Sequence, residues 1–168
     1  DEPEALIKGT HLLMQAAEAN RGMIAIEDNL GGVKSRLDQA IQALGLANIS
    51  VVKVPTIYPT GGEKQLIKVL TGLEVPSGQT PLSLGIIMQN VATTKAVYDA
   101  VEHNRPLTER LVTVTGDLVG QPGNYLTPVG TPFYQLLAQA DCPMSDMDKL
   151  VVGGPMMGYP MPNADIGV

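Results

Sequence analysis

Short apolar runs alternate with stretches of helical periodicity along the first hundred residues, and this order constrains the fold more than any other feature of the sequence. Helices are predicted at about 3–20, 33–44, around 66–70 and about 92–103. Strands are predicted between them at 23–26, 48–55 and 82–90. These runs are apolar throughout, which is typical of parallel strands covered by helices on both faces. We therefore expect an α/β fold built from βαβ units.

The pattern changes near residue 105. Strand-like runs at 111–115 and 125–129 flank the turn-rich stretch "GDLVGQPGN", a short helix begins at Thr131-Pro132 and runs through Leu137, and "KLVVGGPMMG" adds a strand. We expect a Rossmann-like parallel-sheet domain over 1–105 and a small α+β module of the β-grasp type over 106–168. Within this module the methionines of "GGPMMGYPM" are interpreted as core, with an interaction surface as the alternative, and Cys142 as a small buried residue.

Charge and cysteine content exclude several classes of function. The net charge is −6 and no basic cluster occurs, which argues against binding nucleic acid or anionic lipid. The single cysteine, Cys142, excludes an internal disulfide and a cysteine-ligated iron–sulfur cluster within this segment. His11 and His103 lie far apart and are interpreted as structural, so no metal site is expected. No apolar run reaches the length of about 18 residues that a membrane span requires, so we expect no direct membrane insertion.

Several features suggest that the chain belongs to something larger. Hydrophobic residues make up 44% of it, enough to bury a core, and only 17% of residues are charged, which is typical of a piece that rests against a partner. The chain opens at "DEPEALIKGT" without an initiator methionine and ends at "PNADIGV". We interpret it as an internal segment of a longer protein.

A glycine pair stands at the start of one predicted helix. In "IYPTGGEKQLIKVLTG", Gly61 and Gly62 come directly before Glu63 and Lys64. Glycines let backbone amides approach a ligand, and a helix start offers free N–H groups and the positive end of the helix dipole, so this combination favours phosphate. The spacing is neither that of a Walker loop nor that of GxGxxG. A glycine turn with Glu63 in the first helical turn remains the alternative.

Carboxylates follow the first predicted strand. Glu27, Asp28 and Asn29 stand at its end, and ligands of open α/β sheets bind beyond the carboxyl ends of the strands. A carboxylate there could accept hydrogen bonds from ribose hydroxyls. Taken alone, these residues are better explained by capping of the next helix by Asp28 or Asn29.

Polar side chains also follow the other two predicted strands. Gln89 and Asn90 come after the third strand, where their amides could bind a flavin or nicotinamide edge, or Asn90 could cap the helix that follows. Tyr58 comes after the second strand, with a half-buried tyrosine as the alternative. Because the ends of parallel strands meet at one rim, we expect all these clusters to converge there.

The motifs "IAIEDN", "YPTGGEKQLIKVLTGLEVP", "IIMQNVATTKAVYDAV", "RLVTVTG" and "GGPMMG" occur in this order over nearly the whole chain. Together they resemble the family of C subunits of Rnf electron-transport complexes, which belongs with the 51-kDa NADH- and FMN-binding subunits of respiratory complex I. The part after residue 105 resembles the soluble-ligand-binding β-grasp (SLBB) domain of the same family.

The resemblance assigns residues to a flavin and NADH site. Relatives carry Y-x-x-G-E-E-T-A-L and N-N-V-E-T motifs there. The sequence departs from them at Gly62 and Ala92, where relatives have glutamates, and at Gln89, where they have asparagine. The residues implied near the nucleotide or the flavin are Glu27, Asp28, Tyr58, Gly61, Gly62, Glu63, Gln89, Asn90 and Thr93.

The resemblance also implies a function for the parent protein. It would be the peripheral electron-transfer subunit of a membrane-bound, ion-translocating NADH:ferredoxin-type oxidoreductase, on the cytoplasmic side of a bacterial inner membrane. Its implied partners are other subunits of the complex, NADH, and a ferredoxin- or flavodoxin-type carrier. No side chain of this segment is required as an acid–base catalyst, because the cofactor carries the chemistry.

The implied cofactors are FMN, NADH and 4Fe–4S clusters. The family's glycine-rich FMN phosphate loop should lie upstream of this segment and its cluster cysteines downstream, so we expect the segment alone to bind FMN weakly or not at all and to be inactive. Two alternatives stay open. One is a cobalamin reductase of the propanediol-utilisation type, and the other is a docking module with a degenerate nucleotide cleft.

Overall fold

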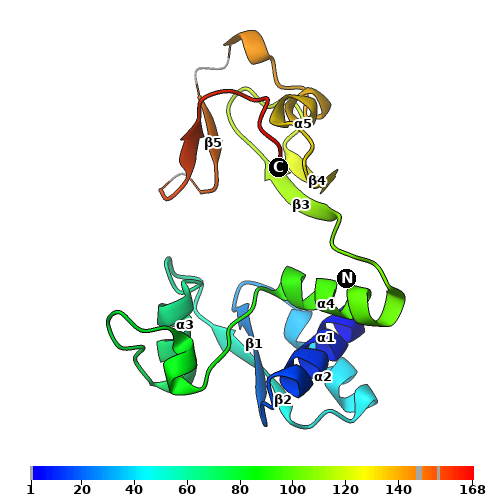
Figure 1. Ribbon diagram of the computed structural model, residues 1–168, viewed down its shortest axis with the longest axis vertical. Helices are drawn as coiled ribbons and strands as arrows, with labels where there is room; N and C mark the ends of the chain where they lie inside the picture. The colour runs from blue at the N-terminus through cyan, green and yellow to red at the C-terminus, as the bar shows by residue number, and fades with distance from the viewer. Residues whose placement is uncertain (1, 147–148, 155) are drawn as a thin grey trace. The chain divides into compact units, whose positions relative to one another are not determined.

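The computed structural model describes residues 2–146, 149–154 and 156–168 (Figure 1). The chain divides into two compact units, Asp1–Pro106 and Leu107–Val168. Each unit has its own hydrophobic core, and each is described separately below. None of the described helices is long and apolar enough to cross a membrane.

A parallel pair of strands forms the centre of the first unit. β1 (Gly22–Glu27) pairs with β2 (Ile49–Val54) in a register that runs from Gly22 opposite Ile49 to Glu27 opposite Val54. Both strands were predicted from their apolar runs, and both predictions are confirmed.

The third predicted strand, at 82–90, is wrong. The 3₁₀ helix η1 (Pro81–Leu84) occupies its start, and Gly85 closes that helix with φ +67°. A left-handed residue turns the backbone away from the extended path that a strand requires. An apolar run alone therefore did not suffice for a strand here.

The four predicted helices of the first unit are present. They are α1 (Pro3–Ala16), α2 (Val33–Leu44), α3 (Glu63–Thr71) and α4 (Val91–His103). Gly45 ends α2 in the left-handed conformation, as expected of a glycine after a helix. α1 stops short of the predicted end at residue 20, because the chain turns at Glu18 with φ +52°.

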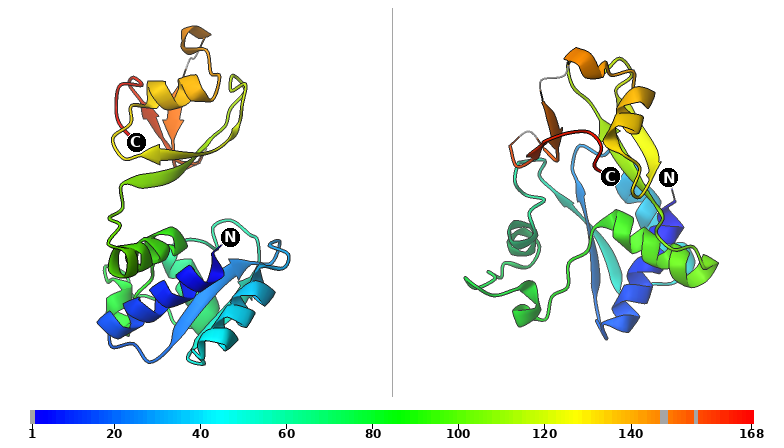
Figure 2. Two further views of the ribbon diagram at one scale, coloured as in Figure 1. Left: turned by 90° about the vertical axis from the view of Figure 1, so that its right-hand side faces the viewer. Right: turned by 45° about the horizontal axis from the view of Figure 1, so that its top comes forward.

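Helices cover both faces of the strand pair, as expected, but unequally. α1 and α2 lie on one face and α3 lies across the other, while α4 packs on α1 (Figures 1 and 2). The core lies on the α1 and α2 face and comprises Ile7, Met14, Ile24, Ile26, Leu37, Ala40, Ile41, Ile49 and Val51. On the α3 face, Met23 and Val52 are only half-buried.

The second unit is built on two antiparallel hairpins and a helix. β3 (Glu109–Val114) pairs with β4 (Gly123–Pro128), and the short strands β5 (Leu150–Val152) and β6 (Tyr159–Met161) pair with each other. Between the hairpins come α5 (Phe133–Gln139) and the 3₁₀ helix η2 (Met144–Asp146). The strands β3, β4 and β5 and the helix were predicted, whereas β6 was not.

The core of the second unit lies between the first hairpin and α5. Its buried residues are Val114, Leu136, Leu137, Ala140, Cys142 and Ala164. The predicted burial of Cys142 is thus confirmed. The C-terminal residues run beside the start of α5, where the N–H of Phe133 donates to the carbonyl of Ile166 over 3.0 Å.

The interpretation of the "GGPMMGYPM" methionines as core is wrong for the two in the turn. Met156 is 69% exposed and Met157 is 74% exposed. Both methionines lie between the short strands β5 and β6, and neither belongs to the core described for this unit.

Candidate functional site

Hydrogen bonds tie the ends of β1 and β2 together. The backbone N–H of Asp28 donates to the carbonyl of Val54 over 3.0 Å. The Asp28 Oδ1 atom accepts from the backbone N–H of Thr56 over 3.2 Å and from the Thr56 hydroxyl over 2.7 Å. The turn after β1 and the loop after β2 therefore share one rim of the sheet.

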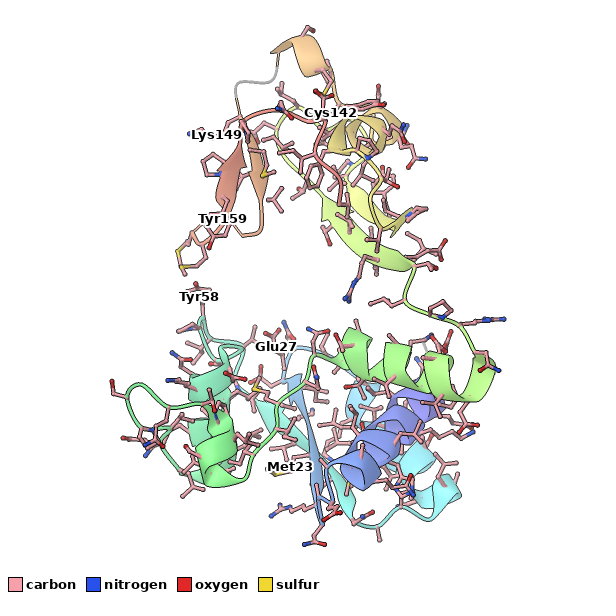
Figure 3. The ribbon with its side chains drawn as sticks, viewed as in Figure 1. Met23, Glu27, Tyr58, Cys142, Lys149 and Tyr159 are labelled. Carbon is pink, nitrogen blue, oxygen red and sulfur yellow. The ribbon has the colours of Figure 1, made fainter. Side chains whose placement is uncertain are left out.

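The capping alternative for Asp28 and Asn29 is wrong. The residue that caps α2 is Gly32, which has φ +76°, and in the described part of the chain no side chain caps this helix. The Asp28 carboxylate faces Thr56 instead. Glu27, also at the end of β1, is exposed, and Figure 3 labels it at this end of the strand.

The Thr56 hydroxyl and backbone N–H lower the pKa of the Asp28 carboxyl below its ordinary value, with a smaller contribution from the charge of Lys53. A lowered pKa means that the folded chain favours the carboxylate, so this contribution to stability is present above the ordinary carboxyl range and is lost as the pH falls through the lowered pKa. We expect the Asp28 carboxyl carbon, followed by NMR against pH, to titrate below 3.8, and to return toward that value in Thr56→Val. Identical titrations in the two proteins would contradict this assignment.

The loop between β2 and α3 is held by successive turns. The N–H of Thr60 donates to the carbonyl of Ile57, and the N–H of Gly62 donates to that of Pro59, each over 2.7 Å. Gly62 is the N-cap residue of α3, and no side chain of the described residues caps this helix. The first N–H groups of a helix have no partner within it, so those of α3 are available to an external acceptor.

The two glycines of this loop differ in their surroundings. A Cβ at Gly61 would meet nothing within 4 Å, so the backbone there is open to approach. A Cβ at Gly62 would lie 2.5 Å from the Gln65 Oε1 atom and 3.2 Å from the Pro59 carbonyl oxygen. Neither glycine has a positive φ, so neither is needed for the conformation of the turn.

Tyr58 lies at the tip of the same loop (Figure 3). Its side chain is 65% exposed, so the alternative of a half-buried tyrosine is wrong. Glu63 is also exposed, in the first turn of α3, where a carboxylate interacts favourably with the helix dipole. These two side chains and Gly61 thus lie on one open loop.

Gln89 and Asn90 follow an irregular segment, because the strand expected before them does not form in this described part of the chain. The Asn90 Oδ1 atom accepts from the backbone N–H of Ala92 over 2.8 Å and caps α4. Thr94 rather than Thr93 is buried, and its hydroxyl donates to the Asn90 carbonyl. Among the described residues, no hydrogen bond or ion pair joins Gln89, Asn90 or Thr93 to the residues at the ends of β1 and β2.

The first unit has two shallow hollows. One lies between α2 and β2 and is lined by residues that include Lys34 and Lys53, and the other lies between α1 and α4 beside Lys95. Neither contains a residue predicted for the site. No group of three histidine, cysteine or acidic side chains suited to a metal ion occurs in the part of the chain that the structure describes.

Thr56 is the residue of this rim that sequence reasoning missed. The sequence held only an indirect signal: once β1 and β2 pair, Pro55, which directly follows β2, comes opposite the turn that holds Asp28. A threonine directly after that proline is within reach of a carboxylate at the end of the neighbouring strand.

Comparison with known proteins agrees with this architecture. Residues 1–99, more than half of the chain, match the Nuo51 FMN-binding domain, and residues 111–160 match the SLBB domain. The chain belongs to the Nuo51 FMN-binding domain family.

The individual relatives that the chain matches are C subunits of one kind of enzyme complex. The chain is 45% identical over 163 residues to the C subunit of the ion-translocating oxidoreductase complex of Pasteurella multocida (strain Pm70), covering 97% of this chain and 19% of that protein. It is 42% identical to the protein of the same name in Haemophilus influenzae (strain PittEE) and 39% identical to that of Yersinia pestis bv. Antiqua (strain Antiqua), over the whole chain and 26% and 27% of those proteins.

The predicted resemblance to the C subunits of such complexes is confirmed by these relatives. They do not favour either alternative, the cobalamin reductase or the docking module. The chain spans roughly a fifth to a quarter of the length of the relatives compared, between 19% and 27%.

Proposed function

We propose that this chain is part of the peripheral electron-transfer C subunit of a membrane-bound, ion-translocating oxidoreductase, and that it supplies one wall of the flavin and nucleotide cleft of that protein. The observation that carries the proposal is the match of residues 1–99 to an FMN-binding domain, combined with the shared rim of β1 and β2. When bound, FMN supplies the hydride and electron chemistry, and the residues of this chain position it.

The groups on this rim fit a flavin nucleotide. α3 offers uncapped N–H groups that suit a phosphate, and the open space beside Gly61 admits close approach of a ligand to the backbone. Tyr58 presents an exposed aromatic ring on the same loop. The proposed cofactor residues on this side are Glu27, Tyr58, Gly61, Gly62 and Glu63, while the Asp28 carboxylate beside them is bonded to Thr56.

The second group of proposed residues is Gln89, Asn90 and Thr93, which we assign to the flavin edge. The Asn90 Oδ1 atom is used by the helix cap, but among the described residues no acceptor is recorded for its amide N–H groups. Those donors suit a flavin carbonyl or ring nitrogen. The assignment of Gln89, Asn90 and Thr93 follows mainly from the family resemblance.

For the whole protein we propose the wider functions of such a complex. These are oxidation of NADH, 4Fe–4S clusters held by cysteines outside this chain, exchange with a ferredoxin- or flavodoxin-type carrier, and a peripheral position on the cytoplasmic face of the membrane. Cys142 is buried, which is consistent with clusters held elsewhere.

The second unit has a surface suited to docking against other subunits. On the outer face of its first hairpin, Leu111 lies opposite Leu126, and both are largely exposed. Met156, Met157 and Tyr159 add exposed apolar area on the second hairpin. Exposed apolar patches of this kind mark protein interaction sites, so we propose that this unit contacts other subunits of the complex.

The cofactor role is tested in a full-length C subunit that carries this sequence. Tyr58→Ala and Glu63→Ala are expected to weaken FMN binding by about tenfold each, the loss of one good contact. The measurement is flavin fluorescence quenching, with NADH oxidation as a second readout. Thr113→Val, in the second unit, is the control. Unchanged flavin affinity and NADH oxidation in both variants would favour a docking module instead.

A pair of Asn90 variants separates its cap from its proposed ligand contact. Asn90→Asp keeps an oxygen for the Ala92 N–H but removes the amide donors, whereas Asn90→Ala removes both. We expect both to weaken FMN binding, while only the alanine variant lowers stability, by about 1 kcal/mol. The measurements are flavin affinity and thermal unfolding. Full flavin affinity in Asn90→Asp would leave Asn90 with its capping role alone.

A further inference from the structure

The Asp28 side chain takes the place of one backbone hydrogen bond between β1 and β2. In a parallel pair, the residue opposite Pro55 donates its N–H to the carbonyl before Pro55 and accepts with its own carbonyl from the N–H after it. Asp28 makes the first of these bonds, to Val54, with its backbone. It makes the second, from the Thr56 N–H, with its carboxylate oxygen over 3.2 Å. The chain has already turned away from β2 at this point, and the side chain continues the ladder.

The loop that this bond holds has few other anchors. Thr56, Ile57, Tyr58 and Pro59 are all exposed. Among the described residues, the two bonds to Asp28 are the only side-chain hydrogen bonds recorded for residues 55–62. The remaining bonds of the loop are backbone turns within it or lead into α3.

We propose that Asp28 is a positioning residue, which fixes the loop of residues 55–62 through Thr56 and so sets the place of Tyr58 and Gly61 in the cleft. The inference rests on the proposed function for its consequence in flavin binding. It differs from the expectation for Asp28 drawn from the sequence, in which the carboxylate itself binds the nucleotide.

The geometry favours this role over direct ligand binding. One oxygen of the carboxylate already accepts two hydrogen bonds, of which the hydroxyl bond is short at 2.7 Å. Bonds to an ionised acceptor are stronger than neutral ones, so a carboxylate holds the loop better than an amide would. The backbone turns from Ile57 to Gly62 link the rest of the loop to Thr56, so fixing Thr56 also fixes these residues.

The first test measures loop opening in the 168-residue chain and needs no flavin. Hydrogen exchange at the amides of Thr60 and Gly62 is expected to accelerate by about threefold to tenfold in Asp28→Ala and in Thr56→Val. Thr56→Ser keeps the hydroxyl and is expected to exchange as the parent does. Thr113→Val is the control, and the amide of Leu46 is the internal reference. Unchanged loop exchange in both Asp28→Ala and Thr56→Val would overturn the proposal.

The second test separates positioning from direct contact in the full-length protein. If Asp28 acts through Thr56, the two single variants and the double variant weaken FMN binding by the same factor, about tenfold. Additive losses, or a loss in Asp28→Ala with none in Thr56→Val, would assign Asp28 to the ligand and overturn the positioning role. If Asp28→Ala does not fold, Asp28→Asn and Thr56→Val address the same bonds.

The two tests keep the inference apart from the proposed function. If the parent protein binds no FMN, the proposed function fails, and loop exchange in the shorter chain still decides whether Asp28 holds the loop. If flavin binds but exchange does not respond, the positioning role alone is refuted.

Discussion

Replacing Gly9 with valine is expected to destabilise the first unit by about 3 kcal/mol, the upper end of the usual cost of overpacking. A Cβ at this position would overlap the carbonyl oxygen of Thr94 and lie 3.0 Å from its carbonyl carbon. The obstacle is backbone of α4, so α1 and α4 would have to separate. Thermal unfolding should show a fall of roughly 4–8 °C for each kcal/mol lost in a unit of this size.

The matched control for this substitution is Gly31→Val. A Cβ at Gly31 would meet nothing within 4 Å, and its φ is not in the left-handed region. We expect its midpoint to stay close to that of the parent chain. A Gly9→Val protein that unfolds at the same temperature as the parent would show that α1 and α4 do not meet as closely as described.

Leu136→Ala is expected to cost the second unit about 2–5 kcal/mol, because truncation of a buried leucine removes its transfer energy and leaves a cavity. Leu136 is 2% exposed and lies in the core beside Leu137 and Ala140. A small unit has little stability to lose, so a large share of its molecules should unfold. The measurement is hydrogen exchange at the amides of Ala140 and Cys142, which bond to carbonyls of α5.

Leu111→Ala is the control, because it makes the same leucine-to-alanine change at an exposed position. Leu111 is 69% exposed, and substitutions at such sites usually change stability by less than about 0.5 kcal/mol. Equal effects of the two leucine substitutions would mean that the core of this unit does not lie between its first hairpin and α5.

The sequence predicted much of the fold, because most elements have a local cause. The apolar runs of β1 and β2 and the helical periodicity between them suffice for a parallel pair with covering helices. The run at 82–90 failed because Gly85 takes a left-handed conformation, which hydrophobicity does not reveal. The strand β6 was missed because three residues around Pro160 carry no periodicity to detect.

The candidate site was less accessible to sequence reasoning, because its contacts join residues distant in the chain. Asp28 and Thr56 are 28 positions apart, and only the register of the strands brings them together. Asn90 shows the converse, since its bond to Ala92 is local and capping was one of the two predicted roles. The exposure of a side chain is also not predicted by sequence patterns, as the exposed methionines of the second hairpin show.

The stretch from residue 150 to residue 163 contains no charged side chain, and it includes the exposed Met156 and Met157. The cross-strand pair of Leu111 and Leu126 is likewise uncharged. Contacts made through such surfaces have little Coulomb attraction to be screened, and salts that strengthen apolar burial favour them. A protein that binds through these uncharged surfaces should therefore stay bound at an ionic strength that releases a protein held mainly by charge.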